Sequence, residues 1–153
     1  MLPRDTWRTS SVRLSSTRSW PVRTRAVQEE REATMTTRRV EKPWGYELIW
    51  AHTERYVGKL LHVKQGHKLS LQYHNKKDET IHVQSGKLLF VVDEGQGLIE
   101  KEMNPGESYH IKPLTKHRMV AITDCDILEV STPELDDVVR LEDAYGRQGT
   151  SKA

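Results

Sequence analysis

Short runs of alternating apolar and polar residues follow one another along the chain from residue 46 to residue 131. Side chains of a β-strand point alternately to its two faces, so this period of two is typical of strands with one buried face. Glycines and prolines interrupt the pattern at short intervals, which argues against long helices. The pattern therefore predicts an all-β fold, a small antiparallel sandwich or barrel. The predicted strands cover residues 46–50, 55–64, 67–74, 79–84, 87–93, 98–103, 108–112, 117–122 and 125–131.

The segments at the two ends depart from this pattern. Near the C-terminus, "PELDDVVRLEDAYGR", residues 133–147, could form one short helix or an irregular clasp. Residues 1–34 contain seven arginines and ten serines or threonines but no lysine or glycine, and they show no sustained hydrophobic period. We expect a disordered tail over 1–34, followed by one domain over 35–153. The tail is either a transit peptide or an extension upstream of a start at Met35, and the change in basic-residue usage favours the second.

Composition narrows the classes of protein to consider. A length of 153 residues with 35% hydrophobic residues suits one small domain. The net charge of +2 is not the footprint of a nucleic-acid binder, and no apolar run is long enough to cross a membrane, so neither partner is expected. Cys125 is the single cysteine, which excludes an internal disulfide, and we interpret it as a buried thiol at a strand start. This favours a reducing compartment, and we expect a cytoplasmic protein.

One predicted strand and the turn after it concentrate side chains that can bind a metal ion. In "HKLSLQYH", residues 67–74, alternation places Gln72 and His74 side by side on one face. Glu79 follows after four polar residues and opens the next strand, so its carboxylate can fold back onto that face. A proline turn downstream leads to His117. Two imidazoles, one carboxylate and one amide oxygen suit zinc, iron(II), manganese or cobalt.

The same stretch resembles the first sequence motif of the cupin family, in which a glycine, a His-x-His pair, a glutamate and a second glycine recur in order. In "GHKLSLQYHNKKDETIHVQSG" a glutamine stands where many cupins carry the first histidine. The matching residues are Gly66, Gln72, His74, Glu79 and Gly86. "NPGESYHIKPLTKH" is similar to the second cupin motif and ends at His117. The resemblance implies a small antiparallel β-barrel or jelly-roll that holds one divalent metal ion.

A closer resemblance is to the type II mannose-6-phosphate isomerase domain, usually the C-terminal half of a bifunctional enzyme that also makes GDP-mannose. It rests on "KPWGYELIW", "LSLQYH", "ETIHVQSG", "PLTKHRM" and "LDDVVRLEDAYGR", which follow one another in the family's order over residues 41–147. The resemblance implies a metal-dependent interconversion of mannose 6-phosphate and fructose 6-phosphate, which serves polysaccharide and GDP-mannose biosynthesis. The metal ligands that it implies are Gln72, His74, Glu79 and His117.

Isomerisation through an enediol also requires a base and a cation for the phosphate. Strand alternation should turn His82 and Arg118 away from the metal site, whereas Arg140 lies in the "DDVVR" part of the closing signature and is our choice for the phosphate. The candidate bases, among which the sequence does not decide, are His67, His82, His110 and Glu47. The candidate phosphate ligands are Arg118, Arg140, Lys59, Lys77 and Lys116, and apart from Arg140 we expect them to be solvated surface residues.

The turn "NKKD" departs from the family pattern and keeps two alternatives open. The bifunctional enzymes carry Arg-Ala before the glutamate, where this chain has Lys77 and Asp78. A lysine retains the charge of an arginine but loses its bidentate fork. The chain could therefore be a non-catalytic module that binds a metal and a sugar phosphate, or an iron(II) cupin oxygenase. In each sugar-phosphate hypothesis the partner is a small molecule, and a homodimer could form by pairing of edge strands.

Overall fold

The computed structural model describes residues 35–150, and within them every regular element is a β-strand. The prediction of a disordered tail over residues 1–34 lies outside the described residues. One antiparallel sheet contains, in spatial order, β1 (Arg38–Lys42), β2 (Gly45–His52), β3 (Val57–Val63), β10 (Cys125–Ser131), β5 (Glu79–Ser85) and β8 (Ser108–Ile111). The second contains β12 (Gly149–Thr150), β11 (Val139–Glu142), β4 (Leu71–Tyr73), β9 (His117–Ala121), β6 (Leu88–Asp93) and β7 (Leu98–Met103).

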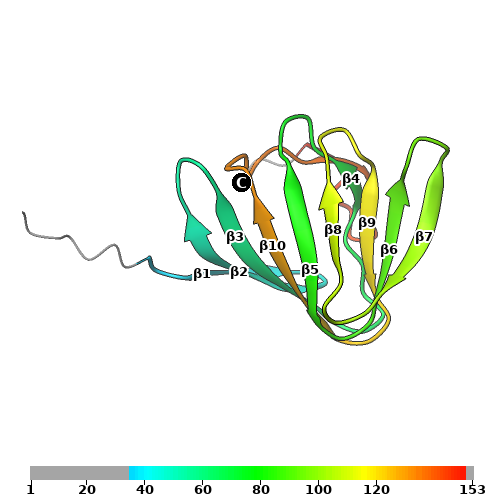
Figure 1. The fold of residues 1–153 in the computed structure, drawn as a ribbon, viewed down its shortest axis with the longest axis horizontal. Coiled ribbons are helices and arrows are strands. Elements are labelled where there is room, and N and C mark those ends of the chain that lie inside the picture. Colours follow the sequence, from blue (N-terminus) through cyan, green and yellow to red (C-terminus); the bar gives the residue numbers. More distant parts are fainter. Residues whose placement is uncertain (1–34, 151–153) are drawn as a thin grey trace, which may run out of the picture. The chain divides into compact units, whose positions relative to one another are not determined.

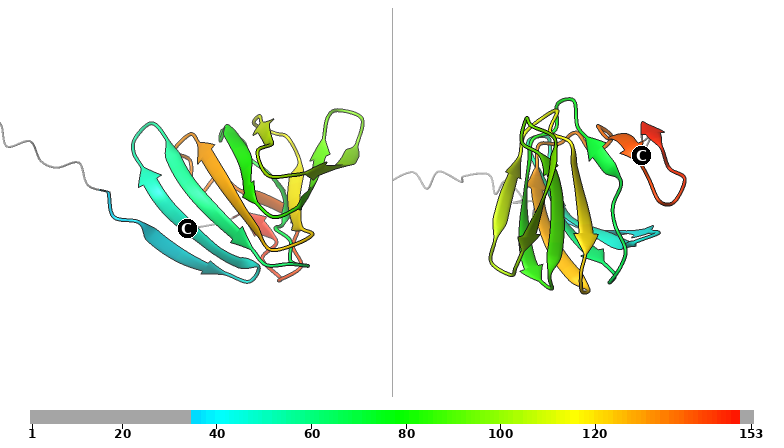
Figure 2. Two further views of the ribbon diagram at one scale, coloured as in Figure 1. Left: turned by 60° about the horizontal axis from the view of Figure 1, so that its bottom comes forward. Right: turned by 90° about the vertical axis from the view of Figure 1, so that its right-hand side faces the viewer.

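The two sheets pack against one another through their inner faces, and the predicted all-β antiparallel fold is confirmed (Figures 1 and 2). Their inner faces share one apolar core, because alternate residues of each strand point inward. Leu61, Ile81 and Ile127 enter it from the first sheet, and Phe90 and Met119 enter it from the second. The described strands form two separate sheets rather than one closed barrel.

The inner faces change from apolar to charged toward one end of the strands. Two residues from Leu61 on β3 stands Lys59, and two residues from Ile127 on β10 stands Glu129. Both charged side chains are buried, as are the apolar neighbours on the same face. Since residues two apart share a face, this end of the interior must be a polar site rather than an extension of the core.

Four parts of the chain differ from the predicted elements, and the short strand β12 over Gly149–Thr150 is one of them. Residues 38–42 form β1, which the sequence pattern did not predict. The stretch 133–147 is not a helix but contains the short strand β11, paired with β4 and β12. The predicted strand 67–74 is regular only in β4, over Leu71–Tyr73. Cys125 does open β10 and is buried, as expected.

The described residues contain no helix long and apolar enough to cross a membrane. The edges of the sheets are β1 and β8 in one and β12 and β7 in the other. Pairing of such an edge with a second copy of the chain stays a prediction.

Gly86, the closing glycine of the first cupin-like motif, is required by the backbone. Its φ is +82°, and a Cβ atom there would lie 2.1 Å from the carbonyl oxygen of Asp124. Backbone at this distance cannot move aside as a flexible side chain would. Gly106 has a similar φ of +94° but no atom within 4 Å of the position of a Cβ.

We expect Gly86→Ala to lower the free energy of unfolding by at least about 2 kcal/mol, because strain and a backbone clash add together. Gly106→Ala should cost only about 1 kcal/mol, from the left-handed conformation alone. Urea denaturation of both variants and of the unchanged chain measures the difference. Equal losses in the two variants would contradict the close approach at Gly86.

Candidate metal-binding site and charged pocket

Three potential metal ligands meet between the sheets. His74 follows β4, Glu79 is the first residue of β5 and His117 is the first residue of β9. Their side chains are nearly inaccessible to solvent. One ligand atom from each lies within 4.8 Å of the others, and Glu79 Oε1 is 3.2 Å from Nε2 of both histidines. Elements far apart in the sequence therefore bring two imidazoles and one carboxylate to a single point.

Both imidazole rings are oriented by backbone carbonyl groups. Nδ1 of His117 donates to the carbonyl oxygen of Thr115 at 2.9 Å, and Nδ1 of His74 contacts the carbonyl oxygen of Asp137. With the proton on Nδ1, each Nε2 presents a lone pair toward Glu79. Nε2 of His117 is buried and has no hydrogen-bond partner among the described residues. Two such lone pairs beside a carboxylate oxygen fit a divalent cation, and the donor set is one that zinc, manganese, iron(II) and cobalt accept.

Gln72 lies next to this group. Its backbone is in register with that of His117 on β9 and with that of Arg140 on β11, so the three side chains form a row on one face. Gln72 Oε1 accepts a hydrogen bond of 2.6 Å from Ser70 Oγ. The structure therefore places Gln72 in register beside His117, with its side-chain oxygen held by Ser70.

Lys77 holds the second oxygen of Glu79. Its Nζ contacts Glu79 Oε2 and lies 2.6 Å from Glu129 Oε1. Burial lowers the pKa of Lys77, but Glu129 and Glu79 outweigh this, so that the pKa stays above its usual value. Burial likewise raises the pKa of Glu79, but the neighbouring charge of Lys77 outweighs this and holds the pKa well below its usual value. Glu79 therefore stays ionised, with one oxygen toward the histidines and the other on Lys77.

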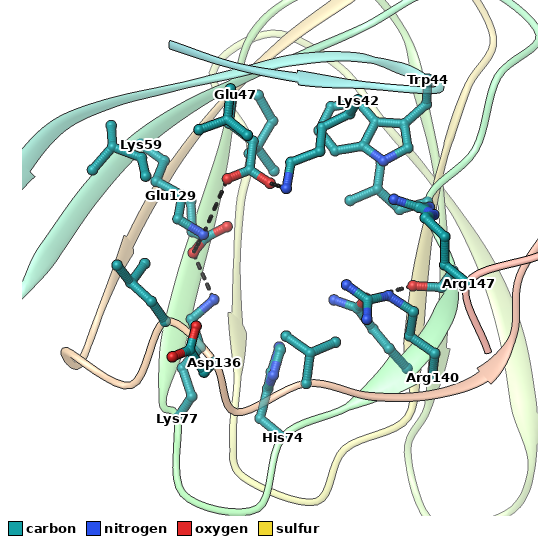
Figure 3. Close-up of a pocket in the computed structure, with 18 of the residues that line it drawn as sticks. Lys42, Trp44, Glu47, Lys59, His74, Lys77, Glu129, Asp136, Arg140 and Arg147 are labelled. Atoms are coloured by element: carbon teal, nitrogen blue, oxygen red, sulfur yellow. Dashed lines mark hydrogen bonds and ion pairs between the residues drawn. The ribbon is translucent and has the colours of Figure 1, made fainter. Parts of the chain in front are cut away.

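Alternating lysines and glutamates continue from this point across the inner face of the first sheet. Lys59 Nζ lies 3.5 Å from Glu129 Oε1 and 3.6 Å from Glu47 Oε2, and Lys42 Nζ lies 3.0 Å from Glu47 Oε1. Figure 3 shows these side chains along one side of a cavity. We call Lys42, Glu47, Lys59, Glu129, Lys77 and Glu79 the Lys–Glu wall. Its three positive and three negative side chains balance.

The wall faces a cavity of about 260 Å³. His74 lies at one end of the view in Figure 3, and Arg140 and Arg147 lie opposite the wall. The charged side chains that line the cavity are six cations and three carboxylates, a cationic excess. They are Arg38, Lys42, Lys59, Lys77, Arg140, Arg147, Glu47, Glu129 and Asp136. Such a cavity is suited to a small anion with polar groups along its length.

Of the four candidate bases, only Glu47 lines this cavity. His67 Nδ1 bonds to the hydroxyl of Tyr145, and His82 and His110 bond to side chains outside the cavity. The prediction that His82 faces away from the metal site is confirmed. Burial raises the pKa of Glu47, but Lys59 and Lys42 bring it below its usual value, so Glu47 is ionised and weakly basic at neutral pH.

The candidate phosphate ligands divide between the cavity and the outside. Arg118 is paired with Glu142 on the outer face of the second sheet, as alternation predicted, and Lys116 is exposed. Arg140 lines the cavity. Lys59 and Lys77 do so as well, and the prediction that they are solvated surface residues was wrong.

The sequence contained a usable signal for Lys59 but not for the other missed residues. In β3, Lys59 alternates with Val57 and Leu61, a period that places its charge on the apolar, inward face. Lys42 belongs to β1, where no element was predicted. Arg147 belongs to the turn after β11, in the stretch for which a short helix or an irregular clasp was expected. Both residues lie in stretches that carry the family resemblance, but no strand alternation there directed either side chain to the cavity.

Asp137 anchors the loop that joins His74 to Glu79. Its carboxylate accepts hydrogen bonds from the backbone N–H groups of Asn75, Lys76 and Lys77, at distances from 2.5 to 3.0 Å. Burial raises the pKa of Asp137, but these donors lower it far below its usual value. One residue of the C-terminal segment thus fixes the loop with its side chain and the ring of His74 with its carbonyl group.

Comparison with known proteins places this site in a family. The sequence matches the family described as "Mannose-6-phosphate isomerase C-terminal" over residues 29–143. It is 37% identical over 116 residues to the mannose-1-phosphate guanylyltransferase ManC of Salmonella typhimurium, a match that covers 72% of this chain and 23% of that protein. The chain therefore spans about a quarter of the length of this relative.

Solved structures confirm the fold. An RmlC-like cupin from Shewanella frigidimarina superposes with a TM-score of 0.58 at 16% identity, over 66% of this chain and 87% of that one. The capsular polysaccharide assembling protein CapF of Staphylococcus aureus gives 0.59 at 19% identity, over 71% and 35%. Oxalate decarboxylase from Bacillus subtilis gives 0.62 at 16% identity, over 73% and 32%. At these identities the likeness establishes the cupin fold.

We expect Asp137→Ala to lower the free energy of unfolding by about 2 kcal/mol, because three backbone N–H groups lose an ionised acceptor. The matched control is Asp136→Ala, which removes an exposed neighbouring carboxylate and should change stability by less than about 0.5 kcal/mol. Urea denaturation in the presence of EDTA keeps metal occupancy out of the comparison. Similar losses in the two variants would show that the loop does not depend on Asp137.

Proposed function

The chain belongs to the family of C-terminal mannose-6-phosphate isomerase domains, and we propose that it is a metal-dependent sugar-phosphate isomerase that interconverts mannose 6-phosphate and fructose 6-phosphate. The observation that carries the proposal is the buried group of His74, Glu79 and His117, of which His74 lines a small cavity with excess positive charge. The reaction would supply or consume precursors of GDP-mannose and of polysaccharides. The guanylyltransferase activity named for ManC is not part of the proposal, because the match covers 23% of that protein.

We assign Gln72, His74, Glu79 and His117 as the ligands of one divalent metal ion. Bound there, the ion would supply a Lewis acid for the oxygen that gains charge as a proton moves between C1 and C2 of the sugar. The neutral amide of Gln72 keeps the ligand charge at that of one carboxylate. Lys77 keeps Glu79 ionised and in place, and the carbonyl groups behind the two histidines keep Nε2 available.

The other roles fall to residues around the cavity. Arg140 stands in register beside Gln72, where its guanidinium group can contact the substrate phosphate. Glu47 is the candidate base that lines the cavity, across from the arginines in Figure 3. To accept a proton from carbon at neutral pH, Glu47 would need substrate to displace one of its two lysine partners, because both lower its pKa.

Glu47 is a weak base as long as both lysines contact it. This favours a second candidate function, a cupin that binds a metal and a sugar phosphate without converting it. In that case the Lys–Glu wall would serve only as a polar surface for the ligand. A third candidate, an iron(II) oxygenase, would use His74, Glu79 and His117 as a facial triad. Gln72 weighs against it, since a fourth protein ligand takes a position that oxygen chemistry needs open.

We expect the full chain to convert mannose 6-phosphate into fructose 6-phosphate, followed in a coupled assay, and to lose the activity in EDTA. One of zinc, manganese, cobalt or iron(II) should restore it, because the ligand set accepts each of these ions. Tight binding of mannose 6-phosphate with no product under any metal would replace the isomerase by the binding module. Oxygen uptake that requires iron(II) would replace it by the oxygenase.

His117→Ala should reduce the affinity for the metal at least about hundredfold, because it removes a ligand rather than a supporting residue, and should abolish turnover. His110→Ala is the matched control: His110 is an exposed histidine paired with Asp78 outside the cavity, and its loss should change neither. Calorimetric titration with zinc or manganese measures affinity independently of activity. Unchanged affinity in a folded His117→Ala variant would remove His117 from the ligand set.

A further inference from the structure

The cavity has two unlike sides. On the Lys–Glu wall, every lysine contacts one or two glutamates and the charges balance. The opposite side carries Arg140 and Arg147, which come from β11 and from the turn that follows it. The positive excess of the cavity therefore lies mainly on the arginine side, as Figure 3 shows for the labelled side chains.

Arg147 is held rigidly in this position. Its Nη2 donates to Asp143 Oδ1 at 2.7 Å and its Nε donates to Asp143 Oδ2 at 3.1 Å, a two-point contact with a carboxylate whose side chain is fully buried. Asp143 Oδ2 also accepts from the backbone N–H of Tyr145 and of Arg147 itself. Asp143 fixes one edge of the guanidinium group, and the group as a whole lines the cavity.

Arg140 and Arg147 influence one another. Burial lowers the pKa of Arg140 first, and the like charge of Arg147 lowers it further, while Asp143 and Glu47 act in the opposite direction. Both guanidinium groups line the same cavity, and burial and the charge of Arg147 together outweigh the two carboxylates that act on Arg140. A dianion placed there would relieve the repulsion and accept from both groups.

We propose that Arg140 and Arg147 form a phosphate subsite, with Asp143 as its positioning residue, and that the Lys–Glu wall binds the hydroxyl groups of the same ligand. The proposal rests on the proposed function for the identity of the sugar phosphate. It adds Arg147 as a binding residue and fixes the direction in which the substrate lies.

The spacing of the strands fits a hexose with its phosphate at one end. Arg140 and His117 pair with Gln72 from opposite sides, so their backbones are two strand spacings apart, about 10 Å. A six-carbon sugar phosphate can span that distance, with its carbonyl end at the histidines and its phosphate at the arginines. The cavity of about 260 Å³ is small for a nucleotide sugar, which favours a phosphate monoester.

The experiment titrates mannose 6-phosphate, inorganic phosphate, mannose and GDP-mannose separately into the full chain by calorimetry. The variants are Arg147→Lys and Arg140→Lys, which keep the charge and lose the fork, so that Asp143 is not left unpaired. Both variants should lower the affinity for mannose 6-phosphate and for inorganic phosphate by the same factor, about tenfold. The affinity for mannose should not change. The matched control, Arg118→Lys, alters an arginine on the outer face of β9 and should bind like the unchanged chain.

Unchanged affinity for both phosphate ligands in Arg147→Lys would overturn the subsite, and so would an equal loss for mannose. Tighter binding of GDP-mannose than of mannose 6-phosphate would contradict the choice of a monoester. The titration does not require turnover. A chain that fails to isomerise but loses phosphate affinity in the variants keeps the subsite and rejects only the isomerase. An active chain whose KM is unchanged in both variants rejects only the subsite.

Discussion

The buried carboxylate of Glu79, shared between two histidines and Lys77, is the interaction on which the interior of this protein depends. A charge buried between two sheets is tolerated only if an opposite charge pairs with it. The partner is then buried as well and needs an opposite charge of its own. Lys77 compensates Glu79 and requires Glu129, Glu129 requires Lys59, and Lys59 leads to Glu47. The result is a chain of ion pairs at one end of an otherwise apolar interior. Loss of one member would leave its neighbours buried and uncompensated, so the wall behaves as a unit.

The C-terminal segment makes this interior usable. Asp137 fixes the loop between His74 and Glu79, and its carbonyl group orients the ring of His74. A few residues later, β11 pairs with β4 and carries Arg140, and the following turn carries Arg147. The same segment therefore sets the geometry of the ligands and provides one side of the cavity. Folding of this segment and assembly of the site are coupled for that reason.

Much of this could be predicted from the sequence, because the local period of two and the spacing of a motif survive in the fold. Alternation predicted nine strands and the outward direction of His82 and Arg118, and the motif selected the three residues that meet at the site. The Lys–Glu wall could not be predicted, because its contacts join β1, β2, β3, β10 and the loop before β5. The register between strands that are distant in the sequence cannot be inferred from the local sequence pattern. The strand over residues 38–42 and the turn at Arg147 were missed because they lack a clear apolar face and depend on their neighbours.

The position of Lys77 changes the meaning of the departure in "NKKD". A substitution of arginine by lysine at a phosphate contact would remove a bidentate fork and weaken binding of the substrate. In this structure, however, Nζ of Lys77 faces Glu79 and Glu129, one oxygen from each. A compact ammonium group between two separate carboxylates suits that geometry, whereas a planar fork is made for the two oxygens of one group. The departure therefore affects how Glu79, the proposed metal ligand, is held, and in our proposal recognition of the phosphate falls to the arginines on the opposite side of the cavity.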